Sequence, residues 1–366
     1  MVIPLAKPNI PKEAKEKVLE VLESGMLVQG KEVKQLEDKI ASYLGVNHAI
    51  CVTSGTATLH LSLLSLGIGP GDEVIVPAYS YVATANVVEL VGAKPVFVDI
   101  DIKTFNINSS DIEDAISSKT KAIIPVHEFG LSSNISEILS IASKHKLAVI
   151  EDAACALGAK EDNRFVGSFG EFGSFSFHPR KAITSGEGGV LTTDDEKLAR
   201  KIRILRNHGI DIKKGEMDFV DAGYNYRMTD IQAALVSCQF DNLDEIISYK
   251  QQLAEIYRNE IRNEKVKLPV VPENKNHTWQ TYHVMLPSEA DRNRLRKHLS
   301  EAGIMTNYGA QCIPHMTYYQ NKYNHHSEVE FPNAYRAYTC GLAIPLYDLL
   351  TIDNIKYISN SINNFN

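Results

Sequence analysis

The 366-residue chain has 44% hydrophobic residues, enough for a full globular core, and a net charge of −7, which disfavours a nucleic-acid-binding protein. No stretch approaches the roughly 18 unbroken apolar residues of a membrane span, and the N-terminus "MVIPLAKPNI" lacks the basic region and apolar core of a secretory signal. Five cysteines without CxxC spacing indicate reduced thiols, so we expect a cytoplasmic protein with neither a disulfide framework nor a metal site.

Helical and extended patterns alternate from about residue 10 to residue 210. We expect a first helix over 11–25, opened by a proline and closed by a glycine. A second helix is expected over 31–45, with one apolar face and a glycine at its end. Short apolar runs follow at "HAICVT", "EVIVP", "PVFVDI", "KAIIPV" and "LAVIED". Such runs, mostly separated by helices, predict a parallel sheet covered on both faces.

The pattern changes after residue 228. One or two long helices are expected over 228–261 and another over 288–303, with extended runs at "KVKLPVV" and "WQTYHVMLP". We therefore expect an α/β fold. A large doubly wound, mostly parallel sheet domain would span residues 1–240 and a smaller α+β domain residues 241–366, and the N-terminal segment could pack with the small domain. The histidine pair in "NHHSE" is interpreted as part of a surface loop, not as a metal site.

Residues that directly follow the predicted strands are the first candidates for a site, because α/β sheets bind ligands at the carboxyl ends of strands. "CVTSGTATLHLSL" joins a strand to a helix whose first amides suit a phosphate, although an ordinary helix cap explains the same residues. Tyr79 and Tyr81 could stack on a flat ring or belong to the core. Glu151 and Asp152 end an apolar strand, where an ionised carboxylate needs a partner unless it caps the next segment.

The segment "GSFSFHPRK" alternates with period two. Ser176 and His178 fall on one face of the predicted strand, and Phe175 and Phe177 fall on the other. Lys181 follows in the turn, just before "GEGG", where glycines let the backbone pass close to a ligand. Taken alone, this lysine would be a solvated surface charge.

Together these residues have the chemistry needed to hold pyridoxal phosphate (PLP). A lysine forms a Schiff base with the aldehyde of the cofactor. A buried carboxylate keeps the ring nitrogen protonated, so that the ring can accept carbanion charge. We therefore predict that Lys181 and Asp152 hold PLP, with a phosphate turn and an aromatic side chain beside them.

The chain resembles the DegT/DnrJ/EryC1/StrS family of PLP-dependent nucleotide-sugar aminotransferases, and within it the perosamine-synthase-like members. The resemblance runs from "SGMLVQGKEV" to "LAIPLYDLL", which is nearly the whole chain. The motifs "PVFVDID", "IPVHEFG", "EDAACALGA", "SFSFHPRKAITSGEGG" and "GYNYRMTDIQAAL" occur in the family's order. This resemblance implies the fold of PLP-dependent transferases of fold type I.

The resemblance also implies roles for individual residues of the cofactor site. Lys181 would be the Schiff-base lysine, Asp152 the partner of the ring nitrogen, and Tyr81 the stacking aromatic. The residues implied to contact the phosphate are Gly55, Thr56, Ser176 and, from the neighbouring subunit of a homodimer with shared sites, Asn225.

Two further positions follow from the same resemblance. His315 would lie on the substrate side. Cys155 stands where many relatives have glutamine, near the phenolic oxygen of the cofactor, which puts a hydrogen bond there in doubt.

The activity implied is transfer of an amino group, with L-glutamate as donor, to a nucleotide-linked keto-deoxy sugar in polysaccharide biosynthesis. A dehydratase branch of the family replaces the lysine with histidine, whereas this chain keeps Lys181. The alternatives are sugar dehydration, amino-acid transamination, or a catalytically silent binding or regulatory homologue. The sequence leaves open the sugar, the nucleotide, amination at C3 or C4, the pathway product and assembly beyond a dimer.

Overall fold

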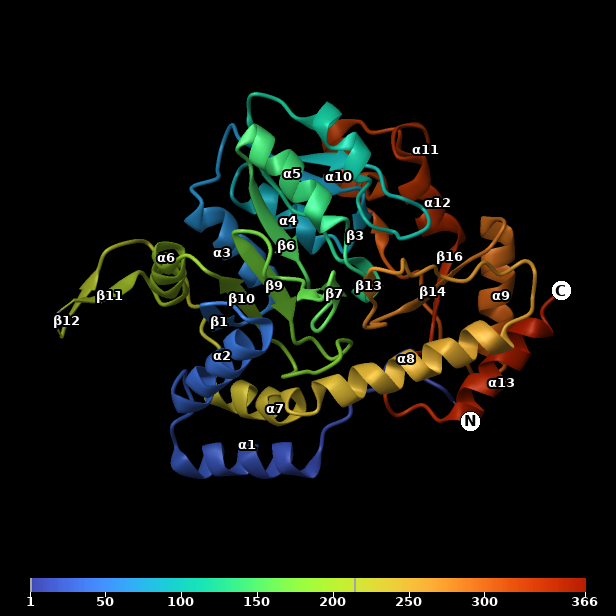
Figure 1. The fold of residues 1–366 in the computed structure, drawn as a ribbon, viewed down its shortest axis with the longest axis horizontal. Coiled ribbons are helices and arrows are strands. Elements are labelled where there is room, and N and C mark those ends of the chain that lie inside the picture. The colour runs from blue at the N-terminus through green and yellow to red at the C-terminus, as the bar shows by residue number, and fades with distance from the viewer. Residues whose placement is uncertain (1, 214) are drawn as a thin grey trace.

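A seven-stranded sheet forms the centre of the computed structural model, which describes residues 2–213 and 215–366 (Figure 1). Its strand order is β1-β10-β9-β6-β5-β2-β4, and only β10 runs antiparallel to its neighbours. The strands are β1 (His48–Val52), β2 (Glu73–Pro77), β4 (Lys94–Val98), β5 (Thr120–Ile123), β6 (Ala148–Asp152), β9 (Phe172–Ser176) and β10 (Gly189–Thr193). The predicted, mostly parallel sheet is therefore confirmed.

Both faces of this sheet are buried, as its apolar strands predict. In β2, Val74 and Val76 belong to one hydrophobic core and Ile75 belongs to another on the opposite face. One face is covered by α3 (Gly55–Ser65), α4 (Ala83–Leu90) and α6 (Glu196–Arg206), and the other by α2 (Lys31–Leu44), α5 (Ile135–His145) and α7 (Asp230–Phe240). The fold is thus a doubly wound α/β domain.

The first two predicted helices are confirmed, and glycines end them. Helix α1 (Lys12–Ser24) packs against α7, and its C-cap Gly25 has a φ of 71°. Helix α2 ends at Gly45, with a φ of 70°. A glycine adopts this left-handed conformation without steric cost, which is why it closes each helix.

The second part of the chain contains a smaller α+β unit. The predicted helical segment 228–261 is two helices, α7 and α8 (Leu243–Glu260), and α8 runs away from the sheet (Figure 1). Strands β14 (Tyr282–Met285) and β16 (Gly341–Ile344) pair antiparallel beside α9 (Glu289–Glu301) and α13 (Ile352–Asn363). Ile3 joins this core and bridges to Ile304. We propose the break between α7 and α8, near residue 240, as the domain boundary.

The prediction of a strand at residues 265–271 is wrong. Residues 265–271, "KVKLPVV", are all described and form a single bridge, Lys267 to Met285, instead of a strand. Pro269 has no amide hydrogen to donate to a ladder, which limits pairing at this point.

The segment between β14 and β16 returns to the doubly wound domain, where it forms a separate two-stranded sheet. Strand β15 (Gln311–Cys312) pairs with β3 (Tyr79–Ser80), and α12 (Pro332–Cys340) contacts both strands and contributes to the same hydrophobic core as α3 and α4. The remaining short elements are the strands β7 (Lys160–Glu161), β8 (Arg164–Phe165) and β13 (Lys275–Asn276) and the helices α10 (Thr317–Tyr323) and α11 (Ser327–Glu330).

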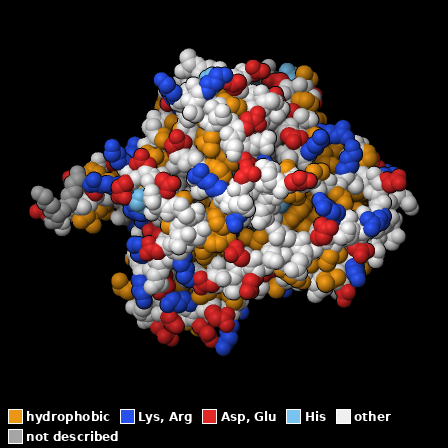
Figure 2. Space-filling view, viewed as in Figure 1, with side chains coloured by type: hydrophobic (Ala, Val, Ile, Leu, Met, Phe, Trp, Pro, Cys, Tyr) orange, Lys and Arg blue, Asp and Glu red, His pale blue; other side chains and the backbone are white. Residues whose placement is uncertain are grey.

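A β-hairpin projects from the body of the molecule beside α6 (Figure 1). It consists of β11 (Ile210–Lys213) and β12 (Glu216–Phe219). Figure 2 shows the same projection, and also shows basic and acidic side chains interspersed over this face. Within residues 2–213 and 215–366, no helix combines the length and the apolar character needed to span a bilayer.

Candidate active site

A cavity of about 400 Å³ lies at the carboxyl ends of five mutually parallel strands of the large sheet. Its wall includes residues that follow β1, β2, β5, β6 and β9, as expected for an α/β sheet. Seven of the nine predicted site residues line it: Gly55, Thr56, Tyr81, Asp152, Cys155, Ser176 and Lys181. The structure therefore brings together side chains that are far apart in the sequence.

One end of the cavity is formed by the start of α3. Ser54 caps this helix, since its Oγ accepts a hydrogen bond from the amide of Ala57 at 3.1 Å. The first amides of a helix have no partner within the helix, so they can bind an anion. A Cβ atom at Gly55 would lie 2.8 Å from the Cβ atom of Ser176, so the glycine permits this close approach. The start of α3 and the hydroxyl of Ser176 together form a cradle that suits a phosphate.

Asp152 lies at the end of β6 and is buried in the cavity wall. Its Oδ2 accepts a hydrogen bond from Thr84 Oγ1 at 2.8 Å, and its Oδ1 accepts one from the amide of Ala154 at 3.2 Å. Burial raises the pKa of this carboxyl, and the hydrogen bond from Thr84 opposes that rise. Both oxygens keep accepting capacity for a further donor inside the cavity.

Glu151, the neighbouring candidate, has a structural role. Its side chain is fully buried on the other side of the strand and lies 3.0 Å from His127 Nε2. It also accepts hydrogen bonds from the amides of Gly167, Phe169 and Gly170, at 2.6 to 2.9 Å. These contacts fix the loop that leads into β9 and leave Asp152 as the carboxyl of this strand end that lines the cavity.

Lys181 occupies the loop after β9, as predicted. Its Nζ lies 3.0 Å from Cys155 Sγ inside the cavity. The loop is held by backbone hydrogen bonds, including those from Phe177 to Gly188 and from Lys181 to His178, both 2.9 Å. Burial raises the pKa of Cys155, which favours the neutral thiol beside the lysine amine.

The two tyrosines after β2 have different environments. Tyr79 is fully buried, with its hydroxyl 3.4 Å from His283 Nε2, so it is a core residue. Tyr81 lines the cavity and remains 67% exposed. Only Tyr81, of this pair, is therefore placed to stack on a ring in the cavity.

Two predicted residues lie outside the cavity of their own chain. Asn225 is exposed and bridges to Asn207 at the base of the projecting hairpin. His315 ends a 3₁₀ turn (Ile313–His315) and packs against the rings of Tyr335 and Tyr338. The roles implied for both residues remain predictions.

Among the wall residues that sequence reasoning does not predict, Thr84 and Glu128 are polar side chains close to Asp152. Glu128 follows the apolar run "KAIIPV", and the same signal identifies Asp152 after "LAVI". Thr84 lies in the first turn of α4, and nothing in the sequence around it marks it as the partner of Asp152.

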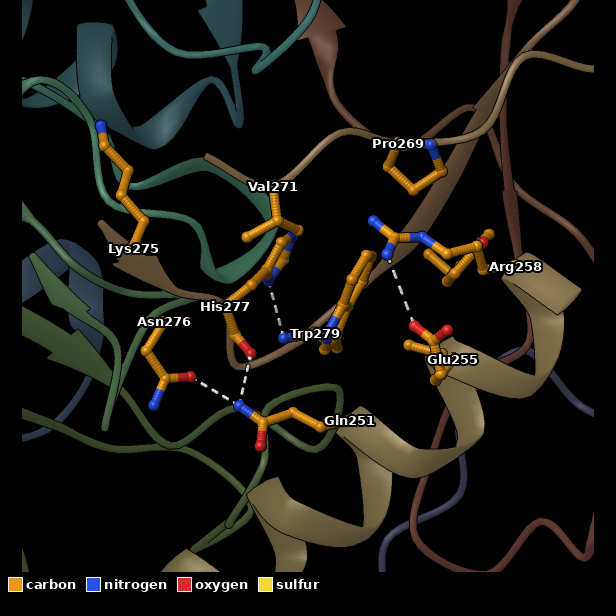
Figure 3. Close-up of a pocket in the computed structure, with 11 residues that line it drawn as sticks. Gln251, Glu255, Arg258, Pro269, Val271, Lys275, Asn276, His277 and Trp279 are labelled. Carbon is orange, nitrogen blue, oxygen red and sulfur yellow. Dashed lines mark hydrogen bonds and ion pairs between the residues drawn. The ribbon is translucent and has the colours of Figure 1, made fainter. Parts of the chain in front are cut away.

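A second cavity, of about 350 Å³, lies between α8 and the segment before β14 (Figure 3). Its lining includes Arg258 and Trp279 but none of the predicted site residues. The ring of Trp279 is stacked between His277, at 4.0 Å, and Tyr282, at 5.2 Å, so neither face is open to a ligand ring. The predicted site residues that line a cavity are therefore all in the first one.

The residues of the first cavity fit PLP. They combine an anion cradle at a helix start, a buried carboxyl and an amine, which match the phosphate, the ring nitrogen and the aldehyde of this cofactor. Among the residues that the structure describes, no group of three or more His, Cys, Asp or Glu side chains is arranged to hold a metal. This fold and this site define a PLP-dependent aminotransferase of fold type I.

Comparison with known proteins identifies the family. The model of the DegT/DnrJ/EryC1/StrS aminotransferase family matches residues 8–363, and the chain belongs to this family of sugar aminotransferases. It is 36% identical to GDP-perosamine synthase from Escherichia coli O157:H7, over 99% of this chain and 98% of that protein. It is 40% identical to GDP-perosamine synthase from Caulobacter vibrioides, over 82% of each.

Solved structures agree with this assignment. The putative sugar aminotransferase Spr1654 from Streptococcus pneumoniae in its PMP form has a TM-score of 0.95 at 30% identity, covering 100% of this chain and 98% of that chain. Its PLP form has a TM-score of 0.92 at 30% identity, covering 99% of this chain and 100% of that chain. The protein is thus a PLP-dependent enzyme, as its sequence predicts.

Proposed function

We propose that this protein transfers the amino group of L-glutamate to the ketone of a nucleotide-linked deoxy sugar. The observation that carries the proposal is a lysine amine, Lys181 Nζ, in the same cavity as the buried Asp152. Two relatives are named GDP-perosamine synthase, which supports a nucleotide-linked sugar as the acceptor. A dehydratase is less well supported, because that branch of the family lacks the lysine.

Each group of the cavity has a task in this reaction. When bound, PLP supplies an aldehyde carbon that carries the amino group and a ring that accepts electrons. The start of α3 and Ser176 would bind the phosphate, and Asp152 would keep the ring nitrogen protonated. Lys181 would hold the cofactor through Nζ, leave it when the donor amine arrives, and then carry the proton between the donor carbon and C4′. In the second half of the reaction, Lys181 would deliver a proton to the sugar carbon that carried the ketone.

The active unit in this proposal is a homodimer with two shared sites. Asn225, implied by the family resemblance to contact the phosphate of the other subunit, is exposed and lies outside the cavity of its own chain. The hairpin beside it exposes four large apolar side chains: Ile212, Met217, Phe219 and Val220. An apolar projection of this kind is costly in water unless a partner covers it, and a second copy of the chain is the occupant we propose.

The proposed activity is tested with purified protein, PLP, ¹⁵N-labelled L-glutamate and a panel of nucleotide-linked keto-deoxy sugars. Mass spectrometry should detect a ¹⁵N-labelled amino sugar and an equal amount of 2-oxoglutarate, and Lys181→Ala should produce neither. A deoxygenated sugar without amino sugar would replace the proposal by a dehydratase. If no sugar is converted although PLP binds, a silent binding homologue would be the better account.

A further inference from the structure

Glu128 is a second carboxyl in the wall of the active-site cavity. It begins a 3₁₀ turn (Glu128–Gly130) shortly after β5 and is 4% exposed. Its amide donates a hydrogen bond to Asn106 Oδ1 at 2.8 Å, and the next residue, Phe129, has a left-handed φ of 57°. The backbone of this turn therefore includes a conformation, at Phe129, that non-glycine residues seldom adopt.

The carboxyl of Glu128 is incompletely satisfied. Its Oε2 is buried and has no hydrogen-bond partner among the described residues. A buried polar atom without a partner costs free energy and calls for an explanation, such as a ligand. The groups that face this carboxyl are Ser80 in β3, the amide of Phe129, Asp152 at the end of β6 and Lys181 in the loop after β9.

Burial, the neighbouring charges and the hydrogen bonds of the two carboxyls together decide whether Glu128 or Asp152 carries a proton. Burial, followed by the charge of Asp152, raises the pKa of Glu128 to about 8, although Lys181 opposes the rise. Asp152 accepts hydrogen bonds from Thr84 and from a backbone amide, both of which favour its ionised form. Two carboxyls in one buried site do not both ionise readily, so at neutral pH the proton resides on Glu128. Two other titratable groups, Cys155 and Tyr79, lie close enough for the charge of Glu128 to raise their pKa values.

We propose that Glu128 is a cofactor-positioning residue whose Oε2 donates a hydrogen bond to the phenolic oxygen of PLP. This inference rests on the proposed function. PLP has four polar groups, and three already have partners: the phosphate at α3, the ring nitrogen at Asp152 and the aldehyde at Lys181. The phenolic oxygen is the fourth, and Oε2 of Glu128 is a polar atom of the wall that lacks a partner. Cys155, beside Lys181, is a weaker donor because it offers a thiol.

The test compares Glu128→Leu with Glu128→Gln, which keeps a neutral donor. Apoprotein is titrated with PLP for the dissociation constant, and the visible band of the loaded protein is followed against pH. We expect Glu128→Leu to raise the dissociation constant about tenfold and the pH midpoint of the band by about one unit. Without the donor, the phenolic oxygen holds the proton that it shares with Lys181 more tightly. Glu128→Gln should match the wild type, as should Glu137→Leu, which removes an exposed carboxylate outside the cavity.

Three results would overturn the proposal. If Glu128→Leu leaves both quantities unchanged, Glu128 makes no hydrogen bond to the cofactor. If Leu and Gln both lower the midpoint, the carboxyl acts as a negative charge and not as a donor. If wild-type protein binds no PLP, the proposed function fails together with this inference, whereas binding by the wild type with either of the first two results leaves the proposed function intact. Circular dichroism of each variant verifies that it is folded.

Discussion

At the scale of single residues, Asp152 and Lys181 are each contacted in the cavity by a side chain from another part of the fold. Thr84 in α4 holds Asp152 at the end of β6, and Cys155 contacts Lys181 in the loop after β9. The sequence predicts Lys181 and Asp152 because unusual residues stand at strand ends. It does not predict Thr84 or Glu128, since their roles depend on which side chains face them across the fold.

Replacement of Asp152 by asparagine tests its electrostatic role. Asparagine has nearly the same shape but no negative charge, so PLP should still bind while the ring nitrogen loses its stabilising partner. We expect turnover to fall by about two orders of magnitude, equivalent to roughly 3 kcal/mol of transition-state stabilisation. Steady-state kinetics with a converted sugar measures this, with Asp111→Asn on the surface as control. Near-normal turnover would mean that another group protonates the ring.

The pKa of Glu128 predicts how stability depends on pH. It is raised from 4.5 to about 8 in the folded apoprotein, mainly by burial, so the folded state binds more protons than the unfolded state between these values. This contribution to stability is complete below pH 4.5 and is lost as pH rises through 8, with a slope of up to about 1.4 kcal/mol per pH unit. Urea unfolding at several pH values should show this slope in the wild type and its loss in Glu128→Gln. If the free energy of unfolding depends on pH in the same way in the wild type and in Glu128→Gln, the pKa of Glu128 is not raised.

At the scale of elements, local sequence patterns predict where helices end and which segments form strands. Which strands pair depends on residues that are far apart in the chain. Glycines mark where α1 and α2 stop, and the apolar runs mark the strands of the large sheet. The local pattern of residues 265–271, "KVKLPVV", predicts a strand, but the segment forms only a single β-bridge. The pairing of β14 with β16 could not be predicted, because the two strands are separated by more than fifty residues of helix and loop and nothing in either sequence specifies its partner.

The contact between α3 and β9 leads to a prediction at the scale of elements. Gly55→Ala would place a Cβ atom 2.8 Å from the Cβ of Ser176, so the helix start or the serine must move. Displacement of the phosphate cradle should weaken PLP binding by about tenfold, or roughly 1.4 kcal/mol. Gly69→Ala is the matched control, because its Cβ would meet nothing closer than 3.6 Å. Equal PLP affinity of both variants in a fluorescence titration would exclude the cradle assignment.

At the scale of the whole molecule, the site is assembled from distant parts of the chain. The cavity wall includes residues from position 54 to position 310, and β15 and α12 bring the segment 311–340 back to the core of the doubly wound domain. The sequence predicts the two-part organisation from the change of pattern near residue 228. It does not predict this return, which depends on apolar faces that meet only in the folded chain.

Complementation between inactive variants tests the shared site. Lys181→Ala and Asn225→Ala proteins are unfolded, mixed and refolded together, and activity is compared with that of each variant alone. If subunits share sites, half of the dimers are hybrids with one fully native site of two, which predicts roughly a quarter of wild-type activity. Activity no greater than the average of the separate variants would show that Asn225 does not act across a subunit boundary.

Lys181 is the residue expected to bind PLP, and borohydride reduction of the loaded protein followed by peptide mapping tests this role most directly. We predict a visible band at about 400 to 430 nm that reduction bleaches, with the phosphopyridoxyl mass fixed on Lys181. The chain offers a rival: Lys250 is buried, and burial lowers its pKa to about 8, so it too could react as a neutral amine. A label on Lys250, or on any lysine other than Lys181, would contradict the account.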